Sequence, residues 1–430
     1  MRHRERRSRL ILGCLLGALV ACGGGESVDD AAGWSGTVST EGDVTTVANG
    51  SGSVWGGEAQ LVEEMSIGVD VGEDEYMLGG IGSLYATADR LYVTDGQEPA
   101  VRVYDTEGRF IRNIGSGPGQ GPGEYELPIL VKGAADGTIF VYDARVRRVT
   151  GYDAEGTMLD TWTPTRPSCC AWRMAVSPDG TLWMPVEQPM FESPTGEERY
   201  GAQAYRLGEG KVGEVRWNPQ IDYPRRTFEI HGITMLVPYS PGYSWSLSGD
   251  GGLTVGTSDR YRFEVRRIDG STLIVERDAE PAPVDPAEAE WRRAWTLKNM
   301  RTNIEPDFSV ELDIPDHKPA FGGFAPGADG GTWVERRGAS RHLDGNCVDD
   351  PTTTDLATSR DNSCWESDRF FDIFDPQGRY LGWVRAPDGL SPWNAQLNLY
   401  PMGEVVYAII ESAEGVPMVK RYRVVPPGVR

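Results

Sequence analysis

The sequence has few of the side chains on which metal and phosphate chemistry depends. Its 430 residues include four histidines, and no two of its six cysteines have the C-x-x-C spacing typical of zinc sites. The glycine-rich run GSGPGQGPGEYELP, residues 115–128, lacks the lysine of a P-loop and the glycine spacing of a dinucleotide fingerprint. These absences argue against a nucleotide-binding enzyme and against a zinc finger.

The composition favours an ordered, turn-rich β protein. The chain has 13 tryptophans, 17 tyrosines, 54 glycines and 29 prolines. Its formal net charge is −22, so the surface repels phosphate groups. We therefore expect no nucleic-acid partner, and no contact with anionic lipid beyond any covalent anchor.

The N-terminus has the features of an export signal. Five arginines precede an apolar run over residues 10–20, which is too short to span a bilayer as a mature helix. The run ends in Leu19-Val20-Ala21-Cys22, which resembles the bacterial lipobox. This resemblance implies a signal peptide over residues 1–21 and acylation of Cys22, with palmitate among the expected chains.

The resemblance also implies a location in the cell envelope. Gly23, rather than aspartate, follows the acylated cysteine, which in a Gram-negative host implies the outer membrane. Residues 22–56 are rich in glycine, serine and threonine, and we interpret them as a flexible tether between the lipid and the folded body. We expect a membrane contact through the lipid alone.

The cysteines of the body predict one disulfide bond. Cys347 and Cys364 flank a polar loop, and a bond that closes this loop contributes about 3 kcal/mol by loop-closure arguments. Cys169 and Cys170 are adjacent, and three states remain open for them: a vicinal disulfide, free thiols, or pairing elsewhere. No cofactor and no metal are expected from these residues.

An internal repeat organises the body. Residues 91–109 align with residues 139–157 at a shift of 48, so that Asp95 matches Asp143 and Asp105 matches Asp153. Strand patterns followed by Asp-Gly turns recur in six units that begin near residues 79, 126, 171, 230, 320 and 390. Each unit reads as four short antiparallel strands.

These units predict an all-β, six-bladed β-propeller over residues 57–430, with four-stranded antiparallel blades. The last unit is one strand short, and residues 58–68 have the strand character needed to complete it and close the ring. A β-sandwich with coincidental turn spacing is the alternative fold.

One amphipathic helix is expected at about residues 284–303, inserted between the fourth and fifth units. Asp285 can cap its N-terminus, Pro286 suits its first position and Glu288 completes a capping box. Trp291 and Trp295 lie near one face.

The repeat and the segment Gly119–Tyr125 with Pro128 resemble the bacterial six-bladed β-propeller lipoproteins of the broad TolB-like and NHL-like group. That group often has a GxGPGE[F/Y]xxP segment between its first two blades. The resemblance covers roughly residues 58–425 and implies a fold more than an activity.

The sequence offers little for catalysis. His231, His317 and His342 lie in different units, no G-x-S-x-G elbow is present, and acidic pairs are expected by chance in so acidic a chain. Aromatic side chains with a nearby carboxylate are better suited to bind a sugar, peptide or cation. The candidate ligand face consists of Glu124, Tyr125, Trp172, Tyr243, Trp245, Phe324 and Trp393.

The sequence therefore favours an exported, lipid-anchored binding module that binds a small molecule, a glycan or a protein and has no catalytic activity. We expect a monomer. The alternative is a propeller hydrolase or lyase with a metal or carboxylates in its channel, and a structural role in an envelope complex is a third class.

Overall fold

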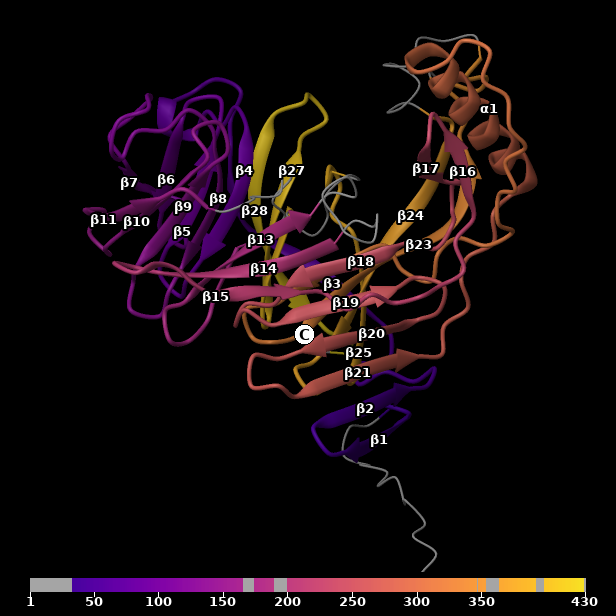
Figure 1. The fold of residues 1–430 in the computed structure, drawn as a ribbon, viewed down its shortest axis with the longest axis horizontal. Helices are drawn as coiled ribbons and strands as arrows, with labels where there is room; N and C mark the ends of the chain where they lie inside the picture. The colour runs from indigo at the N-terminus through magenta and orange to yellow at the C-terminus, as the bar shows by residue number, and fades with distance from the viewer. Residues whose placement is uncertain are drawn as a thin grey trace, which may run out of the picture.

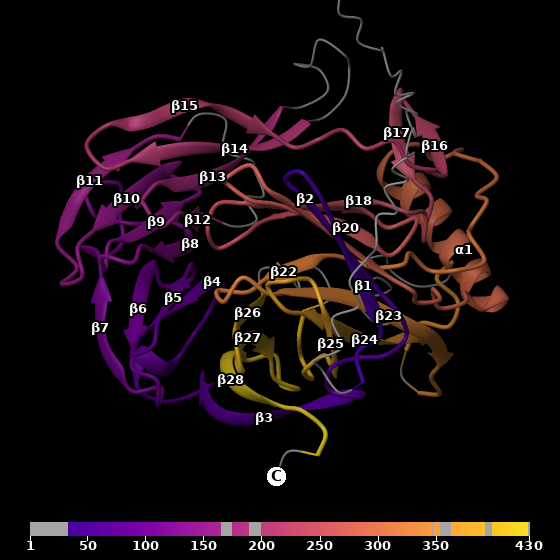
Figure 2. The ribbon, with the colours of Figure 1, turned by 90° about the horizontal axis from the view of Figure 1, so that it is seen from below.

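The computed structural model describes residues 33–164, 174–188, 199–345, 347–352, 363–391 and 398–428. Six four-stranded antiparallel units surround a common centre, and Figure 2 shows β4, β8, β12, β22 and β26 gathered there. The innermost strands of neighbouring blades lie next to one another, and β26 of the last blade meets β4 of the first. The fold is therefore the predicted six-bladed β-propeller.

Blade one contains β4 (Ile81–Ala86), β5 (Leu91–Asp95), β6 (Ala100–Tyr104) and β7 (Phe110–Ile114). Blade two contains β8 (Pro128–Gly133), β9 (Ile139–Asp143), β10 (Arg148–Tyr152) and β11 (Met158–Trp162). Blade three contains β12 (Ala175–Val176), β13 (Leu182–Gln188), β14 (Arg199–Arg206) and β15 (Gly210–Trp217). Blade four contains β18 (Tyr243–Leu247), β19 (Leu253–Thr257), β20 (Arg262–Arg266) and β21 (Thr272–Arg277). Blade five contains β22 (Phe324–Pro326), β23 (Thr332–His342), β24 (Trp365–Phe374) and β25 (Tyr380–Arg385). Blade six contains β26 (Leu399–Met402), β27 (Val405–Glu411), β28 (Pro417–Val425) and β3 (Glu58–Ile67).

The ring is closed by a strand from the N-terminal side of the propeller. β3 pairs antiparallel with β28 over seven register positions and so becomes the fourth strand of the last blade. This confirms the prediction for residues 58–68. The start of β3 also pairs parallel with β25, which joins blades five and six into one eight-stranded sheet.

The predicted tether is too long at its C-terminal end. Residues 36–49 form a β-hairpin of β1 (Gly36–Glu41) and β2 (Val44–Asn49), and β2 pairs parallel with β21. Figure 1 shows this hairpin extending blade four at its outer edge. Trp34 is buried there, and its indole N–H donates to Asn49 Oδ1 at 2.8 Å. The valines and threonines of this segment form strands that pair with a blade, so its polar composition does not make it flexible.

The repeated aspartates have two structural roles. Asp143 is buried at the end of β9 and accepts hydrogen bonds from the backbone N–H groups of Glu126, Leu127, Arg145 and Val146 at 2.7–3.0 Å. Asp95 accepts in the same way from Gly79, Gly80 and Gln97. Each of these carboxylates fixes the connection that enters its blade from the previous one.

The second repeated aspartate shapes the turn before the outermost strand. Asp105 accepts from the N–H groups of Glu107 and Arg109, and Asp153 accepts from those of Glu155 and Thr157. These backbone N–H groups lower the pKa of both carboxyls. The glycine of each turn has a positive φ, 82° at Gly108 and 86° at Gly156, which explains the D-x-E-G pattern.

The glycine-rich segment 115–128 is a joint between blades one and two. Gly115, at φ 102°, leaves no room for a side chain beside the Tyr125 ring. The Arg148 guanidinium donates to the carbonyl oxygens of Gln120, Gly121 and Glu124 at 2.7–2.9 Å, so the segment is held against blade two.

A module projects from the ring beside blades four and five, built from insertions before and after blade four and from the β23–β24 end of blade five. It consists of α1 (Pro286–Asn303), the hairpin of β16 (Thr227–Ile230) and β17 (Ile233–Leu236), and the far ends of β23 and β24 (Figure 1). We call it the α1 module. The fourth unit thus begins with this hairpin near residue 230, while the blade itself begins at β18.

The helix is confirmed, but Glu288 does not act as the reciprocal partner of a capping box. Asp285 caps the N-terminus by accepting from Ala287 N–H at 2.8 Å. The Glu288 carboxylate is fully buried and accepts from the hydroxyls of Tyr239 and Ser340. Lys318, also buried, lies 3.8 Å from it and donates to Ser340 Oγ at 2.7 Å. This polar cluster connects the helix to blade five.

Candidate ligand-binding channel

The propeller axis contains a small chamber to which all six blades contribute. Its lining includes Ser83 and Leu84 of β4, Leu130–Lys132 of β8, Met174 before β12, Leu247 of β18, Pro326 of β22 and Tyr400 of β26. About 40 Å³ of its volume is free for water-sized groups. A water needs roughly 10–15 Å³ of such space, so the chamber admits a small polar head group and excludes a drug-sized molecule.

Among the described residues that line the chamber, Lys132 is the one with a charged side chain. Its ammonium donates to the Tyr400 hydroxyl at 3.1 Å and lies 4.9–5.1 Å from the ring centroids of Tyr400 and Tyr85. The two rings meet edge to face with their centroids 6.1 Å apart. Cation–π attraction and the hydrogen bond to Tyr400 hold the lysine side chain beside these two rings.

The Tyr85 hydroxyl near Lys132 keeps its proton at neutral pH. Burial, with Tyr400 and Tyr92 as neighbours, raises the pKa of Tyr85 well above its ordinary value. This hydroxyl therefore remains neutral and adds no negative charge near the ammonium.

A second recess of about 260 Å³ lies next to the chamber, between blades four and five. The two cavities share Gly249, Pro326 and Ala328 in their walls. Asp250, Asp329 and Arg267 supply charge to the recess. Both aspartates also cap their turns, since Asp250 accepts from Gly252 N–H and Asp329 from Gly331 N–H. The chamber and recess together offer one narrow end and one wider polar end.

The structure does not assemble the predicted aromatic ligand face. Tyr125 is 1% exposed and donates to the Tyr152 hydroxyl at 2.6 Å, and Phe324 is fully buried against Phe263 and Phe321. Both rings are in the core between blades. Because a propeller buries both faces of every blade, aromatic side chains at these positions are used for packing.

The other described members of that face are also separated from one another. The half-buried carboxylate of Glu124 accepts from Gly121 N–H at 2.7 Å within the joint. Tyr243 and Trp245, on β18, are half-buried towards blade three, where Trp245 lies 5.9 Å from the Tyr200 ring. None of these described residues lines the chamber. Trp172 and Trp393 lie outside the described residues, as do Cys22, Cys169 and Cys170.

Sequence reasoning missed Lys132 because a single lysine forms no motif. Its place in the repeat was informative: Lys132 is near the end of the apolar run PILVKG, shortly before the Ala-Asp-Gly turn that joins the first two strands of a unit. A charged side chain near the end of an innermost strand must lie close to the axis.

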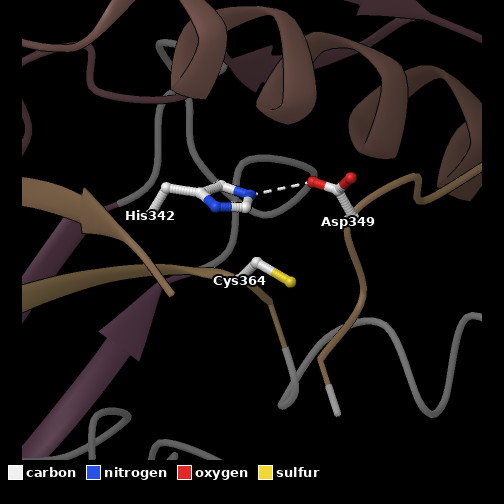
Figure 3. Close-up of side chains that lie close together, drawn as sticks. All are labelled: His342, Asp349 and Cys364. Carbon is white, nitrogen blue, oxygen red and sulfur yellow. Dashed lines mark hydrogen bonds and ion pairs between the residues drawn. The ribbon is translucent and has the colours of Figure 1, made fainter. Parts of the chain in front are cut away.

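The α1 module contains the predicted disulfide and a neighbouring pair of polar side chains. Cys347 and Cys364 are bonded, with their Cα atoms 5.0 Å apart. Figure 3 shows His342 Nε2 directed at Asp349 Oδ1, 2.8 Å away, with the Cys364 sulfur beside them. Of the described residues, only His342, Asp349 and Cys364 form a group with the spacing of metal ligands, so His231 and His317 do not join His342.

Comparison with known proteins supports the fold. The family model DUF5128, described as a 6-bladed beta-propeller, matches residues 71–187, which contain blade one, blade two and part of blade three. A search of curated proteins finds no significant match. Among the described residues, no helix is long and apolar enough to cross a membrane.

Three solved structures of bacterial proteins align with most of this chain. A member of the DUF4221 family from Bacteroides vulgatus is 11% identical, with 86% of this chain and 99% of that chain covered and a TM-score of 0.50. A Bacteroides fragilis protein described as exported is 11% identical, with 85% and 95% covered and a TM-score of 0.42. Virginiamycin B lyase from Staphylococcus aureus is 12% identical, with 85% and 99% covered and a TM-score of 0.36. At these identities the likeness concerns the fold.

Proposed function

We propose that this protein is an exported, membrane-anchored β-propeller that binds a small anionic ligand in its central channel. The observation that carries the proposal is the chamber lined by all six blades, with the Lys132 ammonium fixed between two tyrosine rings at its wall. A carboxylate or phosphate group fits the charge of Lys132 and the hydrogen-bonding hydroxyl of Tyr400.

The dimensions of the cavities determine how such a ligand lies. The chamber accommodates the anionic head group, and the rest of the ligand occupies the recess between blades four and five. Arg267, Asp250 and Asp329 favour a polar body there. Ligands of this size and polarity are metabolites or short glycans and peptides that carry an acidic group.

The alternative of a metal-dependent or carboxylate-dependent hydrolase is not favoured. Among the described residues that line the chamber there is no carboxylate, and the aspartates of the recess also serve as turn caps. A binding role requires only the charge and shape that these cavities have.

The anchoring part of the proposal rests on the lipobox-like segment that ends at Cys22. Two or more acyl chains at one cysteine hold a protein stably on a membrane. An extracytoplasmic position in the cell envelope follows from this segment.

Ligand-observed NMR with a panel of small carboxylates and phosphates, each paired with a neutral amide or alcohol of the same shape, tests the binding proposal. We expect some anions to bind and their neutral counterparts to bind at least about tenfold more weakly, since one lost charge-assisted hydrogen bond costs about 1.5–3 kcal/mol. Lys132→Met should abolish the difference.

Lys211→Met is the matched control, because Lys211 is exposed on β15, the outermost strand of blade three, at the opposite edge of the blade from the chamber. The control should bind the panel as the unmodified protein does. Equal binding of anions and their neutral counterparts, or unchanged anion binding by Lys132→Met, would contradict the proposal.

A further inference from the structure

The disulfide of the α1 module lies within a set of four potential metal donors. One ligand atom each of His342, Asp349 and Cys364 lies within 4.8 Å of the other two, and Cys347 Sγ is bonded to Cys364 Sγ. Two sulfurs, an imidazole nitrogen and a carboxylate oxygen form a donor set that suits tetrahedral Zn²⁺ and does not suit Ca²⁺ or Mg²⁺.

The oxidation state of the cysteines decides whether this set can bind. Metal ligation by cysteine requires the thiolate, and the two sulfurs of a disulfide carry no such charge. We infer that reduction of the Cys347–Cys364 bond converts this group into a Zn²⁺ site whose ligands are Cys347, Cys364, His342 and Asp349. In the reverse step a small-molecule disulfide accepts two electrons and is reduced to its dithiol, the Cys347–Cys364 bond forms again, and the metal is released.

The conversion is balanced with a dithiol as the reductant. Its thiolate attacks the half-exposed Cys347 sulfur, the Cys347–Cys364 bond breaks, and the dithiol leaves as its own disulfide. The two hydrogens of the dithiol end on the cysteine sulfurs. Binding of Zn²⁺ then displaces these two protons into solvent.

Contacts that do not involve sulfur keep the donors together. Leu343 N–H donates to the Cys364 carbonyl at 2.8 Å, and Cys364 N–H donates to the Val348 carbonyl at 3.3 Å. The buried Trp291 of α1 donates its indole N–H to the same Val348 carbonyl at 3.1 Å. These bonds persist when the disulfide opens, so the reduced cysteines remain close to each other.

The site is also open to an incoming ion. The side chains of His342 and Asp349 are 39% and 79% exposed, whereas Cys364 is buried beneath them. In a tetrahedral zinc site the ligand atoms are about 3–4 Å apart, so the two sulfurs move apart once their bond is broken, while His342 and Asp349 close in from within 4.8 Å of Cys364. The α1 module is thereby closed by a covalent link when oxidised and by a metal when reduced.

The test uses the full chain with Cys14, Cys22, Cys169 and Cys170 each changed to serine, which leaves Cys347 and Cys364 as its thiols. The protein is reduced with a dithiol, desalted without oxygen and titrated with Co²⁺ as a spectroscopic stand-in for Zn²⁺. We expect one Co²⁺ per chain, sulfur-to-cobalt charge-transfer bands and the visible bands of four-coordinate cobalt. Zn²⁺ should displace the cobalt, and the oxidised protein should bind neither.

His342→Gln and Asp349→Asn distinguish a four-ligand site from a simple pair of thiols. Each should weaken Co²⁺ binding by at least about tenfold and change the visible bands. His231→Gln is the control, because His231 is exposed in the β16–β17 hairpin and pairs with Glu305. Circular dichroism confirms that each variant is folded. Failure of the reduced protein to bind cobalt, or unchanged binding in both ligand variants, would overturn the inference.

Discussion

At the scale of single residues, the buried aspartates show how an acidic sequence builds a β-propeller. Asp143 uses both carboxylate oxygens to satisfy four backbone N–H groups that the blade ladder does not reach. Asp136, by comparison, lies on an exposed turn and accepts from Thr138 N–H. Part of the acidic composition is therefore structural and does not mark a metal or substrate site.

Asp143→Ala should lower the free energy of unfolding by at least about 1–3 kcal/mol, because buried N–H groups lose a charged acceptor. Asp136→Ala should change it by less than about 1 kcal/mol. Urea unfolding followed by tryptophan fluorescence measures both. Equal effects of the two substitutions would contradict the role assigned to Asp143.

Lys318 makes stability depend on pH above neutrality. Burial lowers the pKa of Lys318 to about 8 in the folded protein, against the pull of Glu288 and with Arg337 and Arg292 adding to the lowering. The unfolded chain has the ordinary value of 10.5, so between these values it binds more protons than the folded protein. The free energy of unfolding should rise with pH over this window.

Urea unfolding at pH 7.5, 8.25 and 9.0 measures this rise. Lys318→Met should remove it, and Lys211→Met should retain it. The series stops at pH 9 because above it the unfolded tyrosines begin to ionise, whereas burial raises the pKa of many folded tyrosines, Tyr239 to about 12 among them, and this lowers the free energy of unfolding. A rise that persists in Lys318→Met would assign the pH dependence to other groups.

Residue-level function was the hardest property to predict from the sequence. The pattern of strands and turns correctly located Phe324 at the start of an innermost strand, but burial between blades removes its ring from the axis. Lys132 carries no motif, and its importance appears only when six distant strands converge. The Cys347–Cys364 pairing was predictable because local chain closure decides it.

At the scale of elements, β3 holds the ring closed. It pairs with β28 along most of its length and touches β25 at its start, so it connects the last blade to its neighbour. Because the chain continues from β3 into β4 of blade one, the pairing of β3 with β28 ties the last blade to the first.

Prolines placed singly at Val62 and Glu63 test the closing strand. Both side chains are exposed, and consecutive N–H groups of a strand point to opposite edges, so one of the two prolines must remove a bond to β28. That variant should lose about 3 kcal/mol or more, and Val62→Ala and Glu63→Ala should lose much less. Thermal unfolding checks this. Full stability of both proline variants would show that β3 does not close the ring.

The sequence predicted the elements that repeat and missed an element that does not. Asp-Gly and D-x-E-G turns recur, and each of the six units has its blade. The β1–β2 hairpin was hidden in a segment of glycine, serine and threonine, although Gly42 and the valines around it are typical of a hairpin. Only its pairing with β21 shows why a polar hairpin is stable there.

At the scale of the whole molecule, the proposed lipid anchor restricts where the body can lie. Eleven residue steps separate Cys22 from Gly33, the first described residue, and a chain of that length spans at most roughly 36–40 Å. The edge of blade four that carries the β1–β2 hairpin therefore stays near the membrane, and the α1 module lies on another side of the propeller (Figure 1).

Cys22→Ser should move the protein from the membrane fraction to the soluble fraction and abolish incorporation of a labelled palmitate analogue. Cys14→Ser, in the same signal segment, is the matched control and should keep both properties. Fractionation of a bacterial host with fluorography of the labelled chain gives the result. Continued labelling of Cys22→Ser would exclude acylation at this cysteine.

The central claim is that the axial chamber is a binding site for an anionic group. A crystal structure of the protein with the tightest anion from the NMR panel tests it most directly. We expect electron density for the carboxylate or phosphate within hydrogen-bond distance of Lys132 Nζ, with the rest of the ligand in the recess between blades four and five. Density on the α1 module or on the outer strands, with an empty chamber, would contradict it.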